Sequence, residues 1–217
     1  MKTGKITKML LIISFIATLF NLARLDIWGT TNLLYLIWNL LLAWIPYLIS
    51  LFFIKKDTPK KYFIPLFILW FLFFPNAPYL VTDVLHIVSS SPALLWYDSL
   101  LFFFFGWIGL FLGMLSLFNV HQYLRGRLSH FISEIIIFII CFISSFGMYL
   151  GRFERWNSWD IFIHPVVLMR HLANIFSSLT HTGIPLLFII IFTIFMYSIY
   201  RTMYVFLEYN CIICKIN

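Results

Sequence analysis

The sequence predicts an all-α protein, a polytopic transmembrane helix bundle of about six spans with one or two interfacial helices on its outer side. Of its 217 residues, 62% are apolar, 21% are aromatic and only 11% are charged, and the mean hydropathy is +0.96. A soluble domain carries about 25% charged residues, so this composition is typical of a membrane protein. Six uncharged runs follow one another along the chain, at residues 9–23, 27–54, 62–82, 99–120, 135–151 and 182–200.

A helix that rises about 1.5 Å per residue needs about 20 residues to cross about 30 Å of hydrocarbon. The second, third, fourth and sixth runs meet this length. The first and fifth are shorter, but the long charged side chains beside them, such as Lys8 and Arg152, can extend outward along the helix. No clear signal-peptide cleavage site follows the first run, so we expect it to be retained as a span. The prediction is one integral membrane domain over residues 1–217.

Lysine and arginine predict the orientation, because they are enriched in cytoplasmic loops. With the N-terminus inside, 11 of the 15 basic residues are cytoplasmic and 4 are outside, namely Arg24, Arg152, Arg155 and Arg170. We therefore expect a multi-pass protein of the cell membrane with both termini cytoplasmic and with the lipid bilayer as its surroundings.

Charge and cysteine content argue against other classes of protein. The net charge of +7 comes from bases scattered between apolar runs, which argues against a nucleic-acid partner. Cys211 and Cys214 have C-x-x-C spacing, but a zinc site needs a second ligand pair and none lies nearby. We interpret them as two tail cysteines of open role, and we expect no metal and no cofactor.

Two outer segments have helical periodicity without the length of a span. Pro75 and Pro78 are expected to end the third span, and apolar residues at helical spacing after Pro78 predict a short interfacial or re-entrant helix. Residues 165–181, in the second half of the long outer loop, separate a polar from an apolar face. They predict a helix that lies flat on the outer leaflet.

Polar side chains gather on the predicted outer side and give the candidate ligand-binding residues: Asn76, Asp83, His86, Asp98, Arg152, Arg155, Asn157 and Asp160. Asp98 lies inside the fourth span, where a carboxylate is costly unless it is paired. Arg152 is its expected partner, with Asp83 nearby. The pair could equally fix helix packing.

Arg152 and Arg155 are three residues apart and could together hold a phosphate. Alternatively Glu154 or Asp160 neutralises them, and Asp160 suits a helix N-cap better than catalysis. Asp83 and His86 could form an acid–base pair or a metal pair. No spaced ligand set accompanies them, so we do not expect a metal site.

Two stretches carry a family resemblance, Phe74-Pro75-Asn76-Ala77-Pro78-Tyr79-Leu80-Val81-Thr82-Asp83 and Gly151-Arg152-Phe153-Glu154-Arg155-Trp156-Asn157-Ser158-Trp159-Asp160. Together with Trp96-Tyr97-Asp98, they resemble the prokaryotic membrane proteins of domain-of-unknown-function family 1361. The resemblance covers roughly residues 30 to 200. It implies a multi-pass protein of a prokaryotic envelope, and it brings no activity, substrate or catalytic residue.

Three functions are compatible with these patterns. The first is an envelope enzyme or binding protein with an extracytoplasmic site for an anionic or lipid-linked ligand. The second is a transporter of small solutes or ions, and the third is a structural subunit of a membrane assembly. A transporter is expected to have charges or helix breaks near the bilayer midplane. The sequence instead places them toward one side, which disfavours transport.

Overall fold

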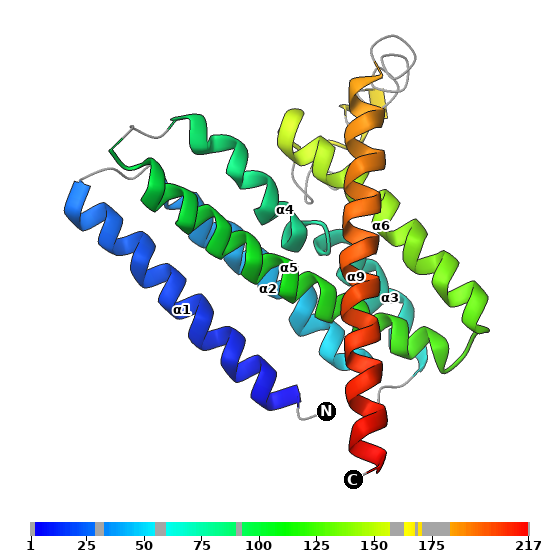
Figure 1. Cartoon of the computed structure of the whole chain (residues 1–217). Helices are drawn as coiled ribbons and strands as arrows, with labels where there is room; N and C mark the ends of the chain where they lie inside the picture. Colours follow the sequence, from blue (N-terminus) through cyan, green and yellow to red (C-terminus); the bar gives the residue numbers. More distant parts are fainter. Residues whose placement is uncertain are drawn as a thin grey trace.

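The computed structural model describes residues 3–28, 33–54, 60–89, 93–156, 163–167, 169–170 and 183–216, and within these ranges it contains helices and no strand. The long helices are α1 (Thr3–Trp28), α2 (Tyr35–Phe53), α5 (Leu95–Arg125), α6 (His130–Phe153) and α9 (Ile184–Ile216) (Figure 1). The shorter ones are α3 (Phe63–Phe73), α4 (Asn76–Thr82) and the 3-10 segments η1 (Lys60–Tyr62) and η2 (Asp83–Ser89).

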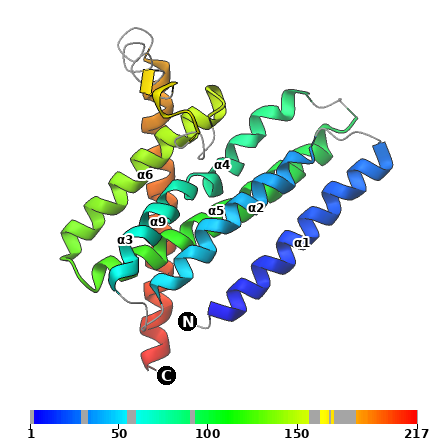
Figure 2. The ribbon, with the colours of Figure 1, turned by 180° about the vertical axis from the view of Figure 1, so that it is seen from behind.

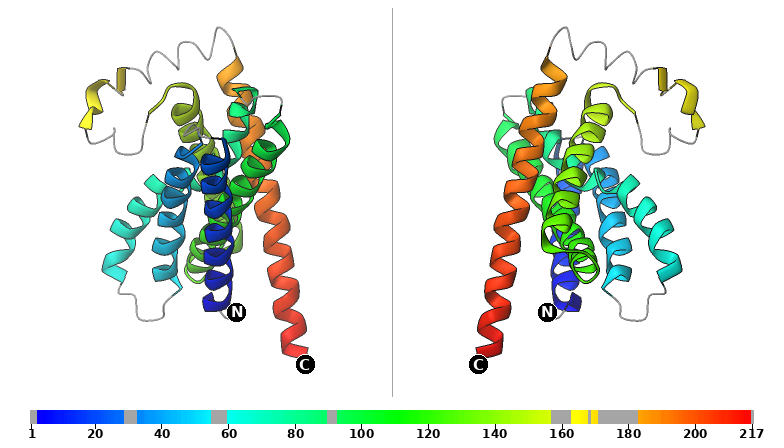
Figure 3. Two further views of the ribbon diagram at one scale, coloured as in Figure 1. Left: turned by 90° about the vertical axis from the view of Figure 1, so that its left-hand side faces the viewer. Right: turned by 90° about the vertical axis from the view of Figure 1, so that its right-hand side faces the viewer.

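Six helical segments of the described chain are long and apolar enough to cross a membrane: Gly4–Arg24, Tyr35–Phe53, Phe63–Ile87, Leu95–Arg125, His130–Phe153 and Ile184–Glu208. The predicted all-α polytopic bundle is confirmed. The start of α1 and the end of α9 lie at the same end of the bundle (Figures 1 and 2), which we call the proximal end. α9 extends past the other helices there (Figure 3). The opposite end is the distal end.

The third span is broken in its middle. α3 stops at Phe73, and α4 starts at Asn76 after Pro75, which has no N–H to continue the helix. In a regular helix the N–H of residue 78 would donate to the Phe74 carbonyl, but Pro78 has no N–H. The Ala77 N–H donates to this carbonyl instead, at 3.2 Å. The predicted break is confirmed, but the prediction that the span ends there is wrong. The membrane-length segment continues to Ile87.

The helix predicted after Pro78 is present, but its first part lies inside the bundle. α4 contacts α2 and α5, and its buried residues are Ala77, Pro78, Leu80 and Thr82. Figure 1 shows α4 running beside α5 toward the distal end. Of the second predicted interfacial helix, over residues 165–181, the structure describes 165–167 and 169–170, which are helical. The rest of that prediction lies outside the described residues.

α5 is the central helix, and it contacts α1, α2, α4, α6 and α9. Two of its glycines allow the close approach of α4. A Cβ atom on Gly109 would clash with the Ala77 carbonyl oxygen and lie 2.7 Å from the Leu80 side chain. On Gly113 it would lie 3.3 Å from both Ala77 and Pro78. Because lipid tails are as apolar as leucine, such packing at small residues is a main source of helix association in a membrane.

Gly109→Ala is expected to destabilise the protein by about 1–3 kcal/mol, since the added methyl meets a backbone carbonyl that cannot move aside. Reversible unfolding in detergent measures the effect. Gly4→Ala is the matched control, because a Cβ there meets no atom within 4 Å. Equal stability of the two variants would contradict the close contact between α4 and α5.

Candidate functional site

Arg152, in the last turn of α6, is the centre of a buried polar cluster at the distal end. Its Nη2 donates to Asp83 Oδ1 at 2.5 Å, and the two side chains are only 7% and 1% exposed. Nε and Nη2 also donate to the Thr82 hydroxyl, at 2.9 and 2.8 Å. Asn39 on α2 donates to the second Asp83 oxygen at 3.1 Å. The cluster therefore joins α2, α4, η2 and α6.

Two rings complete this distal cluster. His86 Nε2 lies 2.7 Å from Arg152 Nη1, and the Tyr79 ring lies 4.2 Å from the guanidinium carbon. Arginine has no acceptor atom, so His86 Nε2 must accept, and the proton of a neutral imidazole is then on Nδ1. Because His86 is exposed, the distal cluster has a polar edge at the surface of the protein.

Tyr35 on α2 lies beside the distal cluster. Its ring makes an edge contact with His86 at 5.5 Å, and it interacts electrostatically with Asp83 and Arg152. The Tyr35 hydroxyl is buried and has no hydrogen-bond partner among the described residues. Leaving a buried hydroxyl without a partner costs about 1–3 kcal/mol. Within the described residues, the Tyr35 hydroxyl is thus a polar group beside the cluster that is available for a further hydrogen bond.

Asp98 forms a second buried pair, and its partner is Arg24 at the end of the first span. Arg24 Nε and Nη2 donate to the two Asp98 oxygens at 2.5 and 2.9 Å, and the side chains are 6% and 0% exposed. The expected pairing of Asp98 with Arg152 is therefore wrong. The first turn of α5 presents Asp98 to α1, whereas Arg152 on α6 binds Asp83. Only the expectation that Asp83 is near Arg152 is met.

Of the remaining predicted site residues, the structure describes Asn76 and Arg155. Asn76 donates to the Phe73 carbonyl at 3.0 Å and lies at the break of the third span. Arg155 is exposed just after α6, with a positive φ of 58°, and it interacts electrostatically with His86. Asn157 and Asp160 lie outside the described residues. The structure thus brings Asp83, His86 and Arg152 together, with Arg155 at the edge.

Sequence reasoning missed a polar cluster at the proximal end, which joins α5, α6 and α9. Its members are the ionisable side chains around Glu134: His121, His130, Tyr197, Tyr200 and Arg201. Arg201 donates to Glu134 Oε1, and Tyr197 donates to Oε2 at 3.3 Å. His121 lies one turn before the end of α5 and Glu134 one turn after the start of α6. The signal available in the sequence was Glu134, a single acidic residue directly before the uncharged run at residues 135–151.

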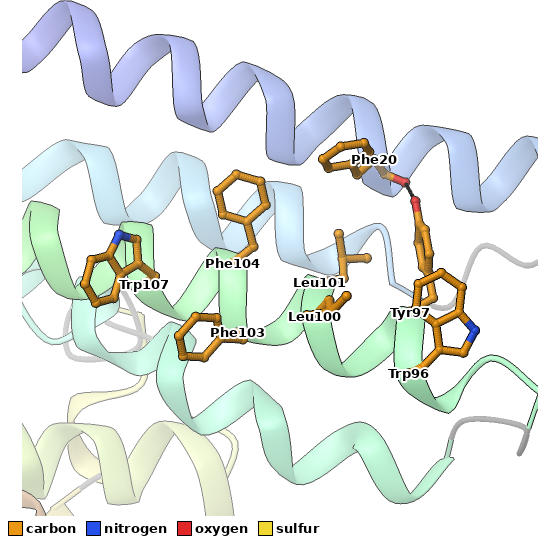
Figure 4. Close-up of a pocket in the computed structure, with 8 residues that line it drawn as sticks. All are labelled: Phe20, Trp96, Tyr97, Leu100, Leu101, Phe103, Phe104 and Trp107. Atoms are coloured by element: carbon orange, nitrogen blue, oxygen red, sulfur yellow. Dashed lines mark hydrogen bonds between the residues drawn. The ribbon is translucent and has the colours of Figure 1, made fainter.

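A cavity of about 570 Å³ lies between α1 and α5, and aromatic and leucine side chains line it: Phe20, Trp96, Tyr97, Leu100, Leu101, Phe103, Phe104 and Trp107 (Figure 4). The Tyr97 hydroxyl donates to the Phe20 carbonyl at 2.7 Å at one edge of this cavity. The lining carries almost no polar surface. Arg24 lies one turn after Phe20 on α1, and Asp98 directly follows Tyr97 on α5. The buried Arg24–Asp98 pair therefore lies beside the cavity.

The two distal pairs should be energetically separate. Removing one partner of a buried pair typically costs about 3–5 kcal/mol, because the other charge remains unpaired. We expect Asp98→Leu and Arg24→Leu to be strongly coupled in a double-mutant cycle of detergent unfolding. Asp98→Leu and Arg152→Leu should instead add within about 0.5 kcal/mol. Coupling of Asp98 to Arg152 in place of Arg24 would contradict the pairing.

Comparison with known proteins gives a family and no function. The chain matches the family model described as "Protein of unknown function (DUF1361)" over residues 38–199. No curated protein and no solved structure matches it. The matched segment contains Asn39, Asp83, His86 and Arg152 but not Arg24. Because the match covers well over half of the chain and six helical segments of the described residues have the length and apolarity of membrane spans, this multi-pass membrane protein belongs to the DUF1361 family.

Proposed function

We propose that the protein binds an anionic headgroup, carried by a lipid or a lipid-linked ligand, at its distal end, and that this end faces the outside of a prokaryotic cytoplasmic membrane. The observation that carries the proposal is the distal cluster, in which a nearly buried arginine is held in place beside an exposed histidine. Ionisable residues within membrane-spanning segments are rare and mark functional sites by default.

The distribution of basic residues supports the orientation. Lys5 and Lys8 lie in the first turns of α1, Arg125 ends α5 and Arg127 follows it, all at the proximal end. Of the distal bases, Arg24 and Arg152 are each bound to a carboxylate within the bundle. Lysine and arginine of the described chain are more numerous at the proximal end, which favours a cytoplasmic proximal end.

The hydrogen-bond arrangement supports an anion as ligand. Four of the five guanidinium N–H groups of Arg152 are used by Thr82, Asp83 and His86. Within the described residues, one Nη1 N–H, His86 Nδ1–H and the Arg155 guanidinium remain as donors at the edge of the cluster. Phosphate oxygens accept such charge-assisted bonds well, and lipid phosphates are found near the ends of membrane-spanning helices, as Arg152 is near the end of the His130–Phe153 span.

Helix packing alone accounts for the Arg152–Asp83 bond but leaves two features without a role. A structural pair needs neither an exposed His86 beside the guanidinium nor a buried Tyr35 hydroxyl that has no partner among the described residues. Both features are useful to a site that accepts an additional polar group. Pre-organised donors of this kind lower the cost of ordering the site on binding.

Transport of a small solute is the second candidate, and the mid-span break favours it. The third span runs from Phe63 to Ile87, and its break at Phe74 and Pro75 lies halfway, where transporters often interrupt a helix. The break is closely packed here: Phe74 is fully buried, and Gly147 lies against Pro75. Because the break lies halfway along the span, the one-sided position that was expected, and that argued against transport, is not observed.

The binding proposal predicts preferential interaction with an anionic lipid. In nanodiscs, phosphatidylglycerol should bind more tightly than phosphatidylcholine, as measured by spin-labelled lipid. Arg155→Gly removes one charge and retains the positive φ, since glycine adopts it freely. One basic residue near the surface contributes about 1 kcal/mol, so we expect about fivefold weaker binding of phosphatidylglycerol.

Arg127→Gln is the matched control, because Arg127 is an exposed arginine at the proximal end. It should leave the affinity for outer-leaflet lipid unchanged. In intact cells, a membrane-impermeant thiol reagent should label Arg155→Cys and leave Arg127→Cys unlabelled. Equal binding of the two lipids would contradict the ligand class, and the reverse labelling would contradict the orientation.

A further inference from the structure

His121 and Tyr200 are the fully buried ionisable groups of the proximal cluster within the described residues. The His121 side chain is 0% exposed, and its Nδ1 lies 2.5 Å from the Tyr200 hydroxyl. Its Nε2 has no hydrogen-bond partner among the described residues. The nearest carboxylate oxygen is Glu134 Oε1, 3.9 Å away. Nε2 is thus a buried polar atom directed at a charge that lies just outside hydrogen-bond distance.

Neither neutral tautomer satisfies this ring. If Tyr200 donates to Nδ1, the Nε2–H lacks an acceptor, and if Nδ1–H donates to Tyr200, Nε2 lacks a donor. A bridging water would need about 4.5 Å between its two partners, given two hydrogen bonds of about 2.8 Å at a tetrahedral angle. The 3.9 Å separation is too short for that bridge. A second ring proton adds a positive charge that attracts the Glu134 carboxylate toward Nε2–H, which a neutral ring does not do.

We propose that His121 and Glu134 form a proton-binding site that is loaded from the proximal end. A proton from a hydronium ion adds to the lone pair of the His121 ring and leaves one water molecule behind. Nδ1–H then donates to the Tyr200 oxygen, and Nε2–H donates to Glu134 once the two side chains close the remaining gap. Release of the proton to water reverses both steps.

The surrounding charges decide how the site responds. Among the described residues, Glu134 is the carboxylate that faces the His121 ring. The same carboxylate also contacts Arg201, His130 and Tyr197. Arg125 on α5 and Arg201 on α9 oppose a charge on the ring. Arg125 is offset by Glu208 at 2.9 Å, which also accepts from Tyr204. An imidazolium must therefore compete with Arg201 for Glu134, so loading the proton shifts α6 and α9 relative to each other.

The site also has access to water. The Glu134 side chain is 16% exposed and that of His130 is 62% exposed, so both can pass a proton from the proximal surface to the ring. This inference is independent of the distal ligand. A proton site coupled to helix packing would supply the driving ion that the second candidate function requires.

The test is nuclear magnetic resonance of the full chain in nanodiscs with ¹⁵N-labelled histidine, with His121 assigned from the spectrum of His121→Gln. Between about pH 8 and about pH 4, the His121 ring should change from one neutral tautomer to an imidazolium while the protein stays folded. Glu134→Gln should weaken its affinity for the proton by at least about tenfold. Glu208→Gln, which removes a carboxylate bound to Arg125, should leave the titration nearly unchanged.

The proposal is overturned if the His121 ring keeps one neutral tautomer over the whole pH range in which the wild-type protein is folded. It is also overturned if Glu134→Gln titrates as the wild type does. Should Glu134→Gln fail to fold, Tyr200→Phe provides the second comparison, because it removes the other ring partner and retains the ring volume. Unchanged proton affinity in Tyr200→Phe would then contradict the site.

Discussion

The cost of an unpaired charge in hydrocarbon is the constraint on which this structure depends. A charged side chain deep in a bilayer is tolerated when it is paired or faces a polar cavity. Besides the more exposed Arg125–Glu208 pair, the described chain meets this condition with three pairs that each join different segments, Arg24–Asp98, Arg152–Asp83 and Arg201–Glu134. They connect α1 to α5, η2 to α6, and α6 to α9, so the charges specify which helices are neighbours.

The broken third span follows the same logic. The interruption at Pro75 lets α4 lie against the glycines of α5, and η2 then presents Asp83 to the last turn of α6. Apolar packing between helices is weakly directional in lipid. The Arg152–Asp83 bond supplies direction, because its geometry is satisfied at one position of α6 relative to η2.

The six spans and the break at Pro75 could be predicted from the sequence, because uncharged length and the missing proline N–H act locally. Asp83, His86 and Arg152 are among the predicted site residues, and the structure brings these three together. The partner of Asp98 could not be predicted, since Arg24 and Arg152 end their spans at the same end of the bundle. Depth alone does not tell which helix lies beside α5.

The proximal cluster was missed for a different reason. Basic residues at the cytoplasmic ends of spans are expected from topology, so Arg201 and Arg125 carried no separate signal. Glu134 and His121 come from different helices, and only the packing of α5 against α6 and α9 brings them together. Buried polar atoms that have no partner in the described part of the chain, such as His121 Nε2 and the Tyr35 hydroxyl, can be found only from a structure.

Exchange of the two charges of the distal pair tests the central claim most directly. Arg152→Asp and Asp83→Arg should each prevent stable folding in the membrane, because each places two like charges in a buried position. The double variant restores opposite charges, and detergent unfolding should show that it recovers a large part of the stability lost in either single variant. Single variants that fold as well as the wild type, or a double variant no more stable than the worse single one, would contradict the account.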